Sequence, residues 1–476
     1  MTSIRRHIGI ITLFVIISRL NAVTYTLPRV EITCDTTYSS THFVPAQFTL
    51  VAEDTLRSPI LLRRRGASSL RYDKPSFAIK LIDSLGNKVD TSLLSMRKDN
   101  YWVLDGMCTD LARMRNRAAM DLWQEIAPPL WYQDVEPKAQ NGYDGKMVEV
   151  WYNGAQMGIY CLMERVDRKQ LQLKKYNTSK GGIRGVLYKT VNWSNVSFSP
   201  FTESPPVETN PTWTGWEIKY PGYDEGEPIT WQPLMDHYTI ITQSDSTLFS
   251  DSIANYLDIP TFIRYTLFVE VLSARDNGGK NNYWSFYNTQ LSHKATISMW
   301  DIDHAWGRMY NGQPENTDYR VLSNHYLSNK LYAYYPHYQE SLKTHYTSLR
   351  TGAFSIDHLD SILDTYFSLY RETGMDTIEN QLWNNHNNLT IDIASEQQYI
   401  HEWLLRRLAF LDSIYLIPND TSQKTGNTYV PFDRNSIIAV YDLHGRMVSS
   451  TLAPSLPSGI YILRYRFGKS EKIVIP

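Results

Sequence analysis

The sequence is poor in the features that mark several classes of protein. Cysteine occurs only 3 times in 476 residues, without metal-ligand spacing, so at most one disulfide is expected and neither a cysteine zinc site nor a thiol nucleophile is indicated. The 47 Lys and Arg do not outnumber the 49 Asp and Glu and form no long basic run, which argues against nucleic acid as a partner. Beyond the N-terminus, no apolar run is long enough for a membrane-spanning helix.

The first 22 residues have the pattern of a cleaved secretion signal. Basic residues at 5–7 precede an apolar stretch, 8–17, and positions 20–22 resemble a small-residue cleavage site. The stretch is too short to span a bilayer, and no cysteine follows at once, so a lipid anchor is not expected. We therefore expect a secreted or cell-surface protein.

The length predicts one large two-lobed domain with an appendage. We expect the domain over residues 23–420, a polar linker over 421–435 and a small β segment over 436–476. Helical patterns at 355–370 and 393–416 would belong to a helical second lobe. Residues 178–234, rich in Gly, Pro, Ser, Thr and Trp, suggest an insertion of irregular loops on the substrate side.

The first part of the domain shows strand patterns. Stretches 30–33, 47–51 and 60–63 predict a small antiparallel sheet. In 76–81, period two places Ala78 and Lys80 on one face. A lysine beside a small residue on such a strand can present its ammonium to phosphates, although a solvated strand lysine fits the same pattern.

A helix and a hairpin follow. Asp110 can cap a helix that ends before Pro128, and Arg113, Arg115 and Arg117 give it a basic side. That side is either a solvated face or, through Arg115, a partner for phosphate or carboxylate. Residues 146–164 contain Asn-Gly at their centre, which predicts a tight β-hairpin.

The stretch 275–308 carries the clearest chemistry. Asp276 stands five residues before Asn281, and a strand pair would return the chain to Asp301 and Asp303 beside Asn281. Magnesium prefers such oxygen ligands together with substrate phosphates, and phosphoryl-transfer enzymes use an Asp-x4-Asn loop to orient the acceptor and hold the metal. The same spacing occurs in ordinary turns. A buried helix after Asp258 would hold Asp276 rigidly.

Five motifs in order resemble the CotH kinase family, called after spore coat protein H, over roughly residues 28–417. They are Arg65-Gly66-x-Ser68-Ser69 with Lys74; 111–123 with Arg115-Asn116; Asn153-Gly154-x3-Gly158-x-Tyr160-x3-Glu164; Asp276-x4-Asn281-x-Tyr283; and Trp300-Asp301-x-Asp303-His304-x2-Gly307. The tail resembles the C-terminal sorting domain of type IX secretion in Bacteroidota, through 440–446 and 457–461.

The resemblance implies an α+β, atypical two-lobed protein-kinase-like fold, with a β-rich N-lobe, a helical C-lobe and the small all-β appendage. It implies that the protein binds ATP together with Mg²⁺ or Mn²⁺. It also implies transfer of the γ-phosphate to Ser or Thr hydroxyls of secreted or surface proteins. By motif, Asp276 is the catalytic carboxylate, Asn281 and Asp301 are metal ligands, and Asp303 is an alternative or second ligand. The tail would engage the secretion machinery.

Several positions depart from the kinase pattern. No Gly-rich phosphate loop is present, so Arg65, Ser68 and Ser69 would cover the phosphates. Lys74 and Lys80 compete as the phosphate-contacting lysine.

Other departures lie further along the chain. Glu164 stands where a nucleotide-contacting hinge would be, and Ala274 occupies the usual histidine position before Asp276. The carboxylate expected to pair the lysine is unassigned, with Asp121 and Glu125 as guesses. His304 could touch the metal, but a packing role beside the metal ligands is favoured.

Two other functions compete with the kinase. Aromatic residues make up 13% of the chain, which suits sugar or protein contact and favours a surface scaffold on an inactive kinase fold as the alternative. A metal-dependent hydrolase is less favoured, because no histidine cluster accompanies the aspartates.

Overall fold

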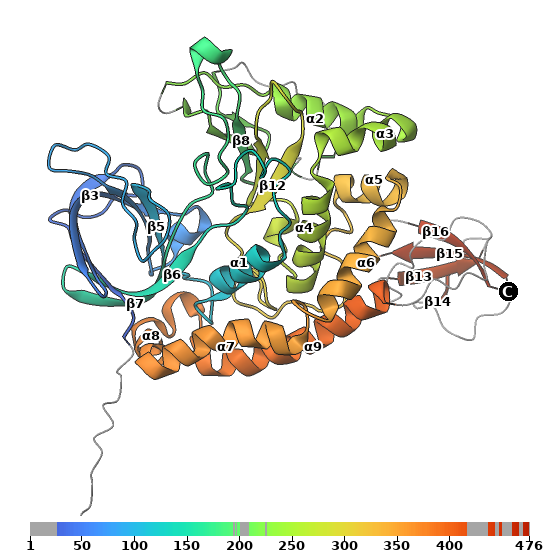
Figure 1. Ribbon diagram of the computed structural model, residues 1–476. Helices are drawn as coiled ribbons and strands as arrows, with labels where there is room; N and C mark the ends of the chain where they lie inside the picture. The colour runs from blue at the N-terminus through green and yellow to red at the C-terminus, as the bar shows by residue number, and fades with distance from the viewer. Residues whose placement is uncertain are drawn as a thin grey trace, which may run out of the picture. The chain divides into compact units, whose positions relative to one another are not determined.

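Seven strands from the first part of the chain close into a barrel in the computed structural model (Figure 1). The order around the barrel is β1-β2-β3-β4-β5-β7-β6, with only β1 and β6 parallel. The bounds are β1 Arg29–Thr33, β2 Val44–Val51, β3 Thr55–Arg65, β4 Ser76–Leu81, β5 Tyr101–Asp105, β6 Gly145–Tyr152 and β7 Ala155–Met163. The predicted small sheet is therefore wrong in extent, because the β6–β7 hairpin pairs with both β1 and β5 and leaves no free edge.

The structure describes residues 26–193, 196, 198–199, 209–223 and 226–416, together with four strands near the C-terminus. The predicted signal segment, 1–22, and the whole of the predicted linker, 421–435, lie outside these residues. The chain divides into two compact units, Met1–Ile417 and Pro418–Pro476. All of the candidate site residues are in the first unit.

The β6–β7 turn is the Asn-Gly hairpin predicted from the sequence. Asn153 and Gly154 both have positive φ, 49° and 78°, as a two-residue turn of this type requires. The Asn153 side chain also accepts the backbone N–H of Cys34 at 2.8 Å and donates to its carbonyl at 2.9 Å. The hairpin tip is thus tied to the end of β1.

A second sheet has the order β12-β11-β8-β10-β9, and all its strand pairs are antiparallel. Its strands are β8 Val186–Thr190, β9 Thr212–Trp213, β10 Trp216–Tyr220, β11 Asn282–Phe286 and β12 Ala295–Met299. The predicted irregular insertion, 178–234, therefore supplies three strands of a sheet. This correction matters because β8 lies directly beside β11, which begins at the Asp276–Asn281 segment.

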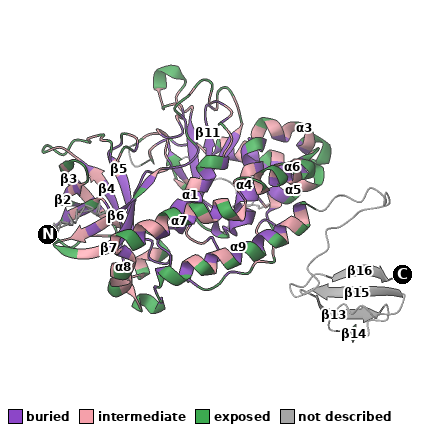
Figure 2. Ribbon diagram, turned by 60° about the horizontal axis from the view of Figure 1, so that its bottom comes forward, coloured by how far each residue is buried: buried purple, intermediate pink, exposed green. Residues whose placement is uncertain are grey.

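Helices fill most of the remaining described chain and pack beside this sheet. They are α1 Arg115–Ile126, α2 Gln232–Thr242, α3 Ser246–Tyr256, α4 Ile259–Leu272, α5 Tyr326–Tyr334, α6 Tyr338–Arg350, α7 Ile356–Thr373, α8 Met375–Trp383 and α9 Ile393–Tyr415. In Figure 2, α4 is almost wholly buried, whereas α7 and α9 are exposed along one side. Helix α8 packs against β7 and so joins the helical part to the barrel.

The three arginines predicted to form the basic side of a helix are buried, so their interpretation as a solvated face is wrong; Arg113 precedes α1, which begins at Arg115. Arg113, Arg115 and Arg117 are each no more than 2% exposed. Arg115 donates to Asp110 and to Glu396, both at 2.6 Å. The structure thus gives Arg115 carboxylate partners from the protein itself, because a buried guanidinium needs a compensating charge.

The α+β class is confirmed, whereas the kinase-like two-lobed arrangement stays a prediction. The three cysteines are buried free thiols.

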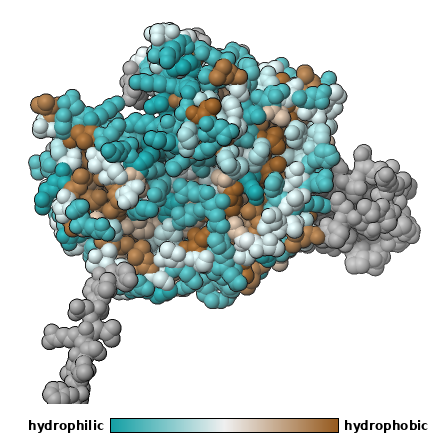
Figure 3. Space-filling model, viewed as in Figure 1, coloured by the Kyte–Doolittle hydropathy of each residue, from teal (hydrophilic) through white to brown (hydrophobic). Residues whose placement is uncertain are grey.

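Within the described residues, no helix has the length and apolar character needed to cross a membrane. The face in Figure 3 is mostly hydrophilic, with apolar side chains in small separate groups.

The second unit contains a four-stranded antiparallel sheet of order β14-β13-β15-β16. Its strands are β13 Ile437–Asp442, β14 Met447–Ser449, β15 Gly459–Tyr465 and β16 Ser470–Ile475. Strands were predicted in this segment from the alternating apolar stretches of the tail.

Candidate functional site

The segment between α4 and β11 is held at both ends. Ser273 adopts a left-handed conformation that ends α4, and Asp276 opens a short 3₁₀ helix, Asp276–Gly278. The Tyr265 hydroxyl from α4 donates to the Asn277 carbonyl at 2.5 Å, and the Asn277 amide donates to the Trp300 carbonyl at 2.9 Å. These buried bonds fix the position of Asp276 between the helix and the β11–β12 hairpin.

Asn281 and Asp301 meet at the open end of that hairpin. Trp300 donates its backbone N–H to the Asn281 carbonyl at 3.0 Å, and the Asn281 amide donates to Asp301 Oδ2 at 3.3 Å. Both residues have positive φ, 58° and 61°, which Asn and Asp tolerate better than most side chains. The predicted return of Asp301 to Asn281 is therefore confirmed as geometry.

Asp276 is bound by two cationic side chains. Its Oδ2 lies 2.8 Å from the Lys280 ammonium and 3.1 Å from His304 Nδ1. Burial raises the pKa of Asp276, but hydrogen bonds and charges from His304 and Lys280 outweigh it, so the pKa is lowered. Asp276 is therefore ionised at neutral pH. Lys280, which stands next to Asn281, was missed by the sequence interpretation.

Asp303 lies in a region of excess negative charge. Thr109 donates to its Oδ2 at 3.1 Å, and His304 Nε2 lies 3.5 Å from its Oδ1. Burial raises the pKa of Asp303 to about 7 against the opposing charge of His304, and Asp301, Asp105 and Asp276 raise it further. Burial lowers the pKa of His304, but Asp303 and Asp276 raise it to about 9.

Asp105 at the end of β5 is a member of this acidic group that the sequence interpretation missed. Ser76 donates to it at 3.0 Å, and the Asn116 amide of α1 donates at 3.3 Å. The Asn116 oxygen accepts the backbone N–H of Ile302 at 3.0 Å. Asn116, which belongs to the quoted Arg-Asn motif, thus links the barrel to the Asp301–Asp303 segment.

Comparison with known families decides the identity of the main unit. The model of the family described as CotH kinase protein matches residues 62–411. The chain belongs to the CotH kinase family. A search of curated proteins gave no match. Membership indicates a kinase-like transferase, and kinases in general use ATP with a divalent cation.

The residues of this CotH family member fit such a cation by the chemistry of their donors. Asn281 and Asp301 offer an amide and a carboxylate oxygen side by side, and Mg²⁺ is usually bound by one or two carboxylates together with phosphates. In the described part of the chain, no cluster of three or more His, Cys, Asp or Glu side chains has a metal-binding arrangement. Two protein donors, one amide and one carboxylate oxygen, fit an ion that takes its other ligands from substrate phosphates and water.

Lys74 is buried between β7 and α8. Its ammonium donates to the Ile159 carbonyl at 2.7 Å and forms an ion pair with Glu379. Glu379 also accepts Arg113 Nε at 2.6 Å and the Ile159 N–H at 2.8 Å. Burial lowers the pKa of Lys74 to about 7, against the opposing charge of Glu379. The carboxylate that pairs this lysine is thus Glu379.

The two acidic residues guessed for that role lie elsewhere. Asp121 pairs with Arg117, and Glu125 binds His358 at 2.6 Å. Lys80, the second candidate lysine, has its ammonium 4.3 Å from the centre of the Phe43 ring and 5.1 Å from that of Tyr101. It lies on the partly exposed side of β4.

The end of β3 brings one predicted residue, Arg65, toward Asp301. The Arg65 guanidinium lies 5.6 Å from the centre of the Trp300 ring, next to Asp301 in the chain. Gly66 has a φ of +135°, and a Cβ there would overlap Ser69 Oγ, so glycine is required. Ser68 is exposed and Ser69 partly buried at the start of η1, Ser68–Arg71.

Glu164 belongs to a separate network. It is 2% exposed, accepts the backbone N–H of Arg97 at 2.9 Å and that of Asp144 at 3.2 Å, and lies 3.6 Å from the Arg97 guanidinium. Burial raises its pKa despite these bonds. Among the described residues, no hydrogen bond or ion pair joins Glu164 to the Asp276 group.

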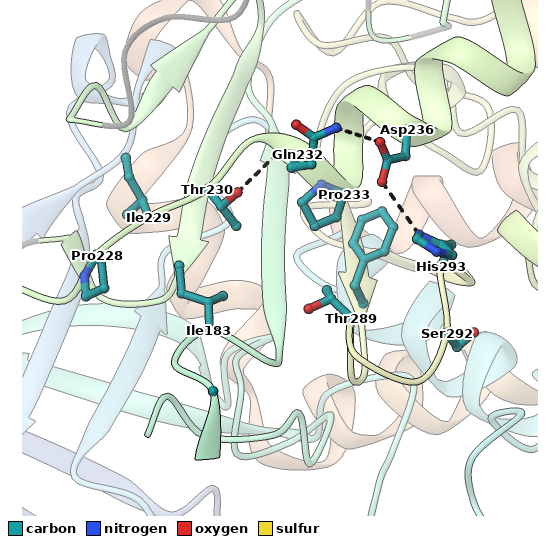
Figure 4. A pocket seen from close by; sticks show the side chains of 12 residues that line it. Ile183, Pro228, Ile229, Thr230, Gln232, Pro233, Asp236, Thr289, Ser292 and His293 are labelled. Carbon is teal, nitrogen blue, oxygen red and sulfur yellow. Dashed lines mark hydrogen bonds and ion pairs between the residues drawn. The ribbon is translucent and has the colours of Figure 1, made fainter. Parts of the chain in front are cut away.

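A cavity of about 460 Å³ lies away from these residues (Figure 4). It opens between the start of α2 and the β11–β12 turn, with Phe286 and His293 among its lining residues. Asp236 there accepts the Gln232 amide at 2.6 Å and lies 3.6 Å from His293. Phe286 is the last residue of β11, whereas Asn281, which contacts Asp301, directly precedes the first. The cavity is therefore at the opposite end of β11 from Asp301.

Proposed function

We propose that the protein transfers the γ-phosphate of ATP to a Ser or Thr hydroxyl of a protein acceptor, with Mg²⁺ or Mn²⁺. The observation that carries this proposal is the contact between Asn281 and Asp301 across the hairpin, with Asp276 fixed a few residues before them. A kinase requires a metal-binding amide and carboxylate beside a carboxylate that orients the acceptor. Family membership supports the same reaction.

Each residue then has a defined task. Asp276, ionised because of Lys280 and His304, would accept a hydrogen bond from the acceptor hydroxyl and take its proton as the oxygen attacks the γ-phosphorus. The bond from the γ-phosphorus to the bridging oxygen breaks, and ADP leaves. Asn281 and Asp301 would hold the cation, which when bound neutralises charge on the phosphate oxygens. Lys280 can add positive charge at the same place.

The reaction can be tested with labelled ATP, Mg²⁺ or Mn²⁺ and a Ser-rich acceptor. Asp276→Asn should lower label transfer by about 100-fold or more, because it removes the proton acceptor. Asp301→Asn should abolish most transfer by weakening cation binding. Asp251→Asn, on the exposed side of α3, is the matched control and should transfer at the wild-type rate. Transfer that survives both site substitutions would refute the proposed site.

Nucleotide-dependent stabilisation separates the kinase from the inactive scaffold. A ligand that binds only the folded state stabilises it by about 2.7 kcal/mol at 100 times its dissociation constant, so Mg-ATP should raise the melting temperature. A wild-type protein with neither stabilisation nor transfer would favour a scaffold on the same fold.

We propose further that the acceptors are secreted or surface proteins. The secretion-signal pattern of 1–22 and the sorting-domain resemblance of the tail support export. Cell fractionation of the full chain should find it outside the cytoplasm. A chain that ends at Ile417 should fail to reach the surface if the tail is the sorting signal.

A further inference from the structure

Lys189 occupies a position beside the candidate metal ligands that no motif indicated. It lies on β8 opposite Tyr283 of β11 and opposite Glu217 of β10. The next residue, Thr190, accepts the backbone N–H of Asn281 at 2.9 Å. Strand pairing therefore fixes the Lys189 backbone two positions from Asn281 across the sheet, on the strand adjacent to β11.

The Lys189 ammonium is partly buried and has no hydrogen-bond or ion-pair partner among the described residues. Its contact is with the ring of Tyr283, whose centre lies 5.7 Å away. Glu217, the acidic residue opposite it, is paired with Lys219. Burial lowers the pKa of Lys189 to about 8, and the nearby Asp301 carboxylate raises it while Lys219 and Arg65 lower it further. A partly buried ammonium that contacts an aromatic ring and has no ionic partner among the described residues is suited to bind an anion.

Arg65 reaches the same place from the barrel. Its guanidinium lies over the Trp300 ring, and that ring meets Tyr283 edge to face, with centres 6.4 Å apart. Among the described residues, Arg65 likewise has no hydrogen-bond or ion-pair partner. Two cations thus lie on either side of an aromatic pair next to Asp301, and their mutual repulsion would be relieved by a multiply charged anion between them.

We propose that Lys189 and Arg65 together bind the phosphate groups of the nucleotide, on the side of Asp301 that faces β8. This assignment rests on the proposed kinase function and identifies its phosphate-binding cations. The ligand class is a polyphosphate, and Arg65 can bind two of its oxygens through one planar group. Lys74 is less suited, because it is only 2% exposed and, among the described residues, no hydrogen bond or ion pair joins it to Asn281 or Asp301.

Calorimetric titration of the full chain tests the assignment. Lys189→Met should weaken Mg-ATP binding by about 10- to 100-fold, the effect expected for loss of one charge-assisted bond. The affinity of Lys189→Met for Mg-tripolyphosphate should fall by a similar factor. Lys189→Arg should retain most of its affinity for both ligands, because the positive charge remains. Arg65→Gln should also weaken the binding of both ligands. It replaces Lys189→Met as the test if that variant does not fold.

The matched control is Lys294→Met. Lys294 directly precedes β12, at the end of that strand opposite to Asp301. Its ammonium lies 5.8 Å from the centre of the Trp131 ring. The Lys294→Met variant should bind Mg-ATP with the affinity of the wild type. Wild-type affinity in both Lys189→Met and Arg65→Gln overturns the assignment and leaves the kinase standing. A wild-type protein that binds neither Mg-ATP nor Mg-tripolyphosphate overturns the proposed function and this assignment with it.

Discussion

The junction between the barrel and α8 and the sheet around Asp301 both remove charged side chains from water, but they differ in how the charges are compensated. At the junction, Glu379 accepts bonds from Lys74, Arg113 and the Ile159 N–H. Around Asp301, Lys189 and Arg65 have no ionic partner among the described residues, and the Asp303 carboxylate lies among other acids. One region is complete as it stands, whereas the other is suited to a ligand.

The difference shows how a structural ion pair can be told from a binding site. A buried charge with its full set of partners stabilises a fold without needing anything further. A buried charge without partners costs free energy, and proteins tolerate that cost mainly where a substrate or ion completes the set. The junction should therefore respond to mutation through stability, and the Asp301 region should respond to ligands and pH.

The largest stability effect is expected at the junction. Glu379→Ala leaves two buried cations and a backbone N–H without their acceptor, so it should lower the free energy of unfolding by about 3–5 kcal/mol. Denaturant unfolding measures this, with Glu340→Ala on the exposed surface of α6 as the control. If the folded fraction of Glu379→Ala also lost Mg-ATP affinity, the junction would belong to the binding site and the contrast would fail.

A pH effect is expected at the acidic group. The folded pKa of His304, about 9, lies above its ordinary value of 6.5, so the stability from its protonated form is complete below about pH 6.5 and is lost as pH rises through 9. Between these values the unfolding free energy should fall by about 1–3 kcal/mol. Melting curves from pH 6 to 9.5 measure the slope. His304→Gln should flatten it, and an unchanged slope would place its cause elsewhere.

The sequence predicted what depends on short-range pairing. The Asn153-Gly154 hairpin and the return of Asp301 to Asn281 both follow from turn residues and alternating strands close together in the chain. The buried helix before Asp276 followed from its continuous apolar pattern. These local features supplied the centre of the candidate site.

The parts that could not be predicted depend on partners far apart in the chain. Lys74 and Glu379 are 305 residues apart, and Arg115 and Glu396 are 281 apart, so no spacing indicated either pair. The place of β8 beside β11 was hidden because a short strand within a Gly- and Pro-rich stretch resembles a loop. Lys189 was therefore missed, since only that strand pairing brings it near Asn281.

The smallest predicted effect is a gain in stability at the candidate site. Asp303→Asn replaces a carboxylate that neighbouring acids oppose, as its raised pKa of about 7 indicates, with a neutral side chain that can still accept the Thr109 hydrogen bond. Without ligand at pH 8, where the carboxylate is charged, the variant should be more stable than the wild type by about 1 kcal/mol. The gain should shrink as the pH falls through 7 and should vanish only below about pH 3.8, where Asp303 is protonated in both the folded and the unfolded protein. Equal stability of the two proteins at pH 8 would mean that the acidic group is compensated without a cation, and the contrast with the junction would then be lost.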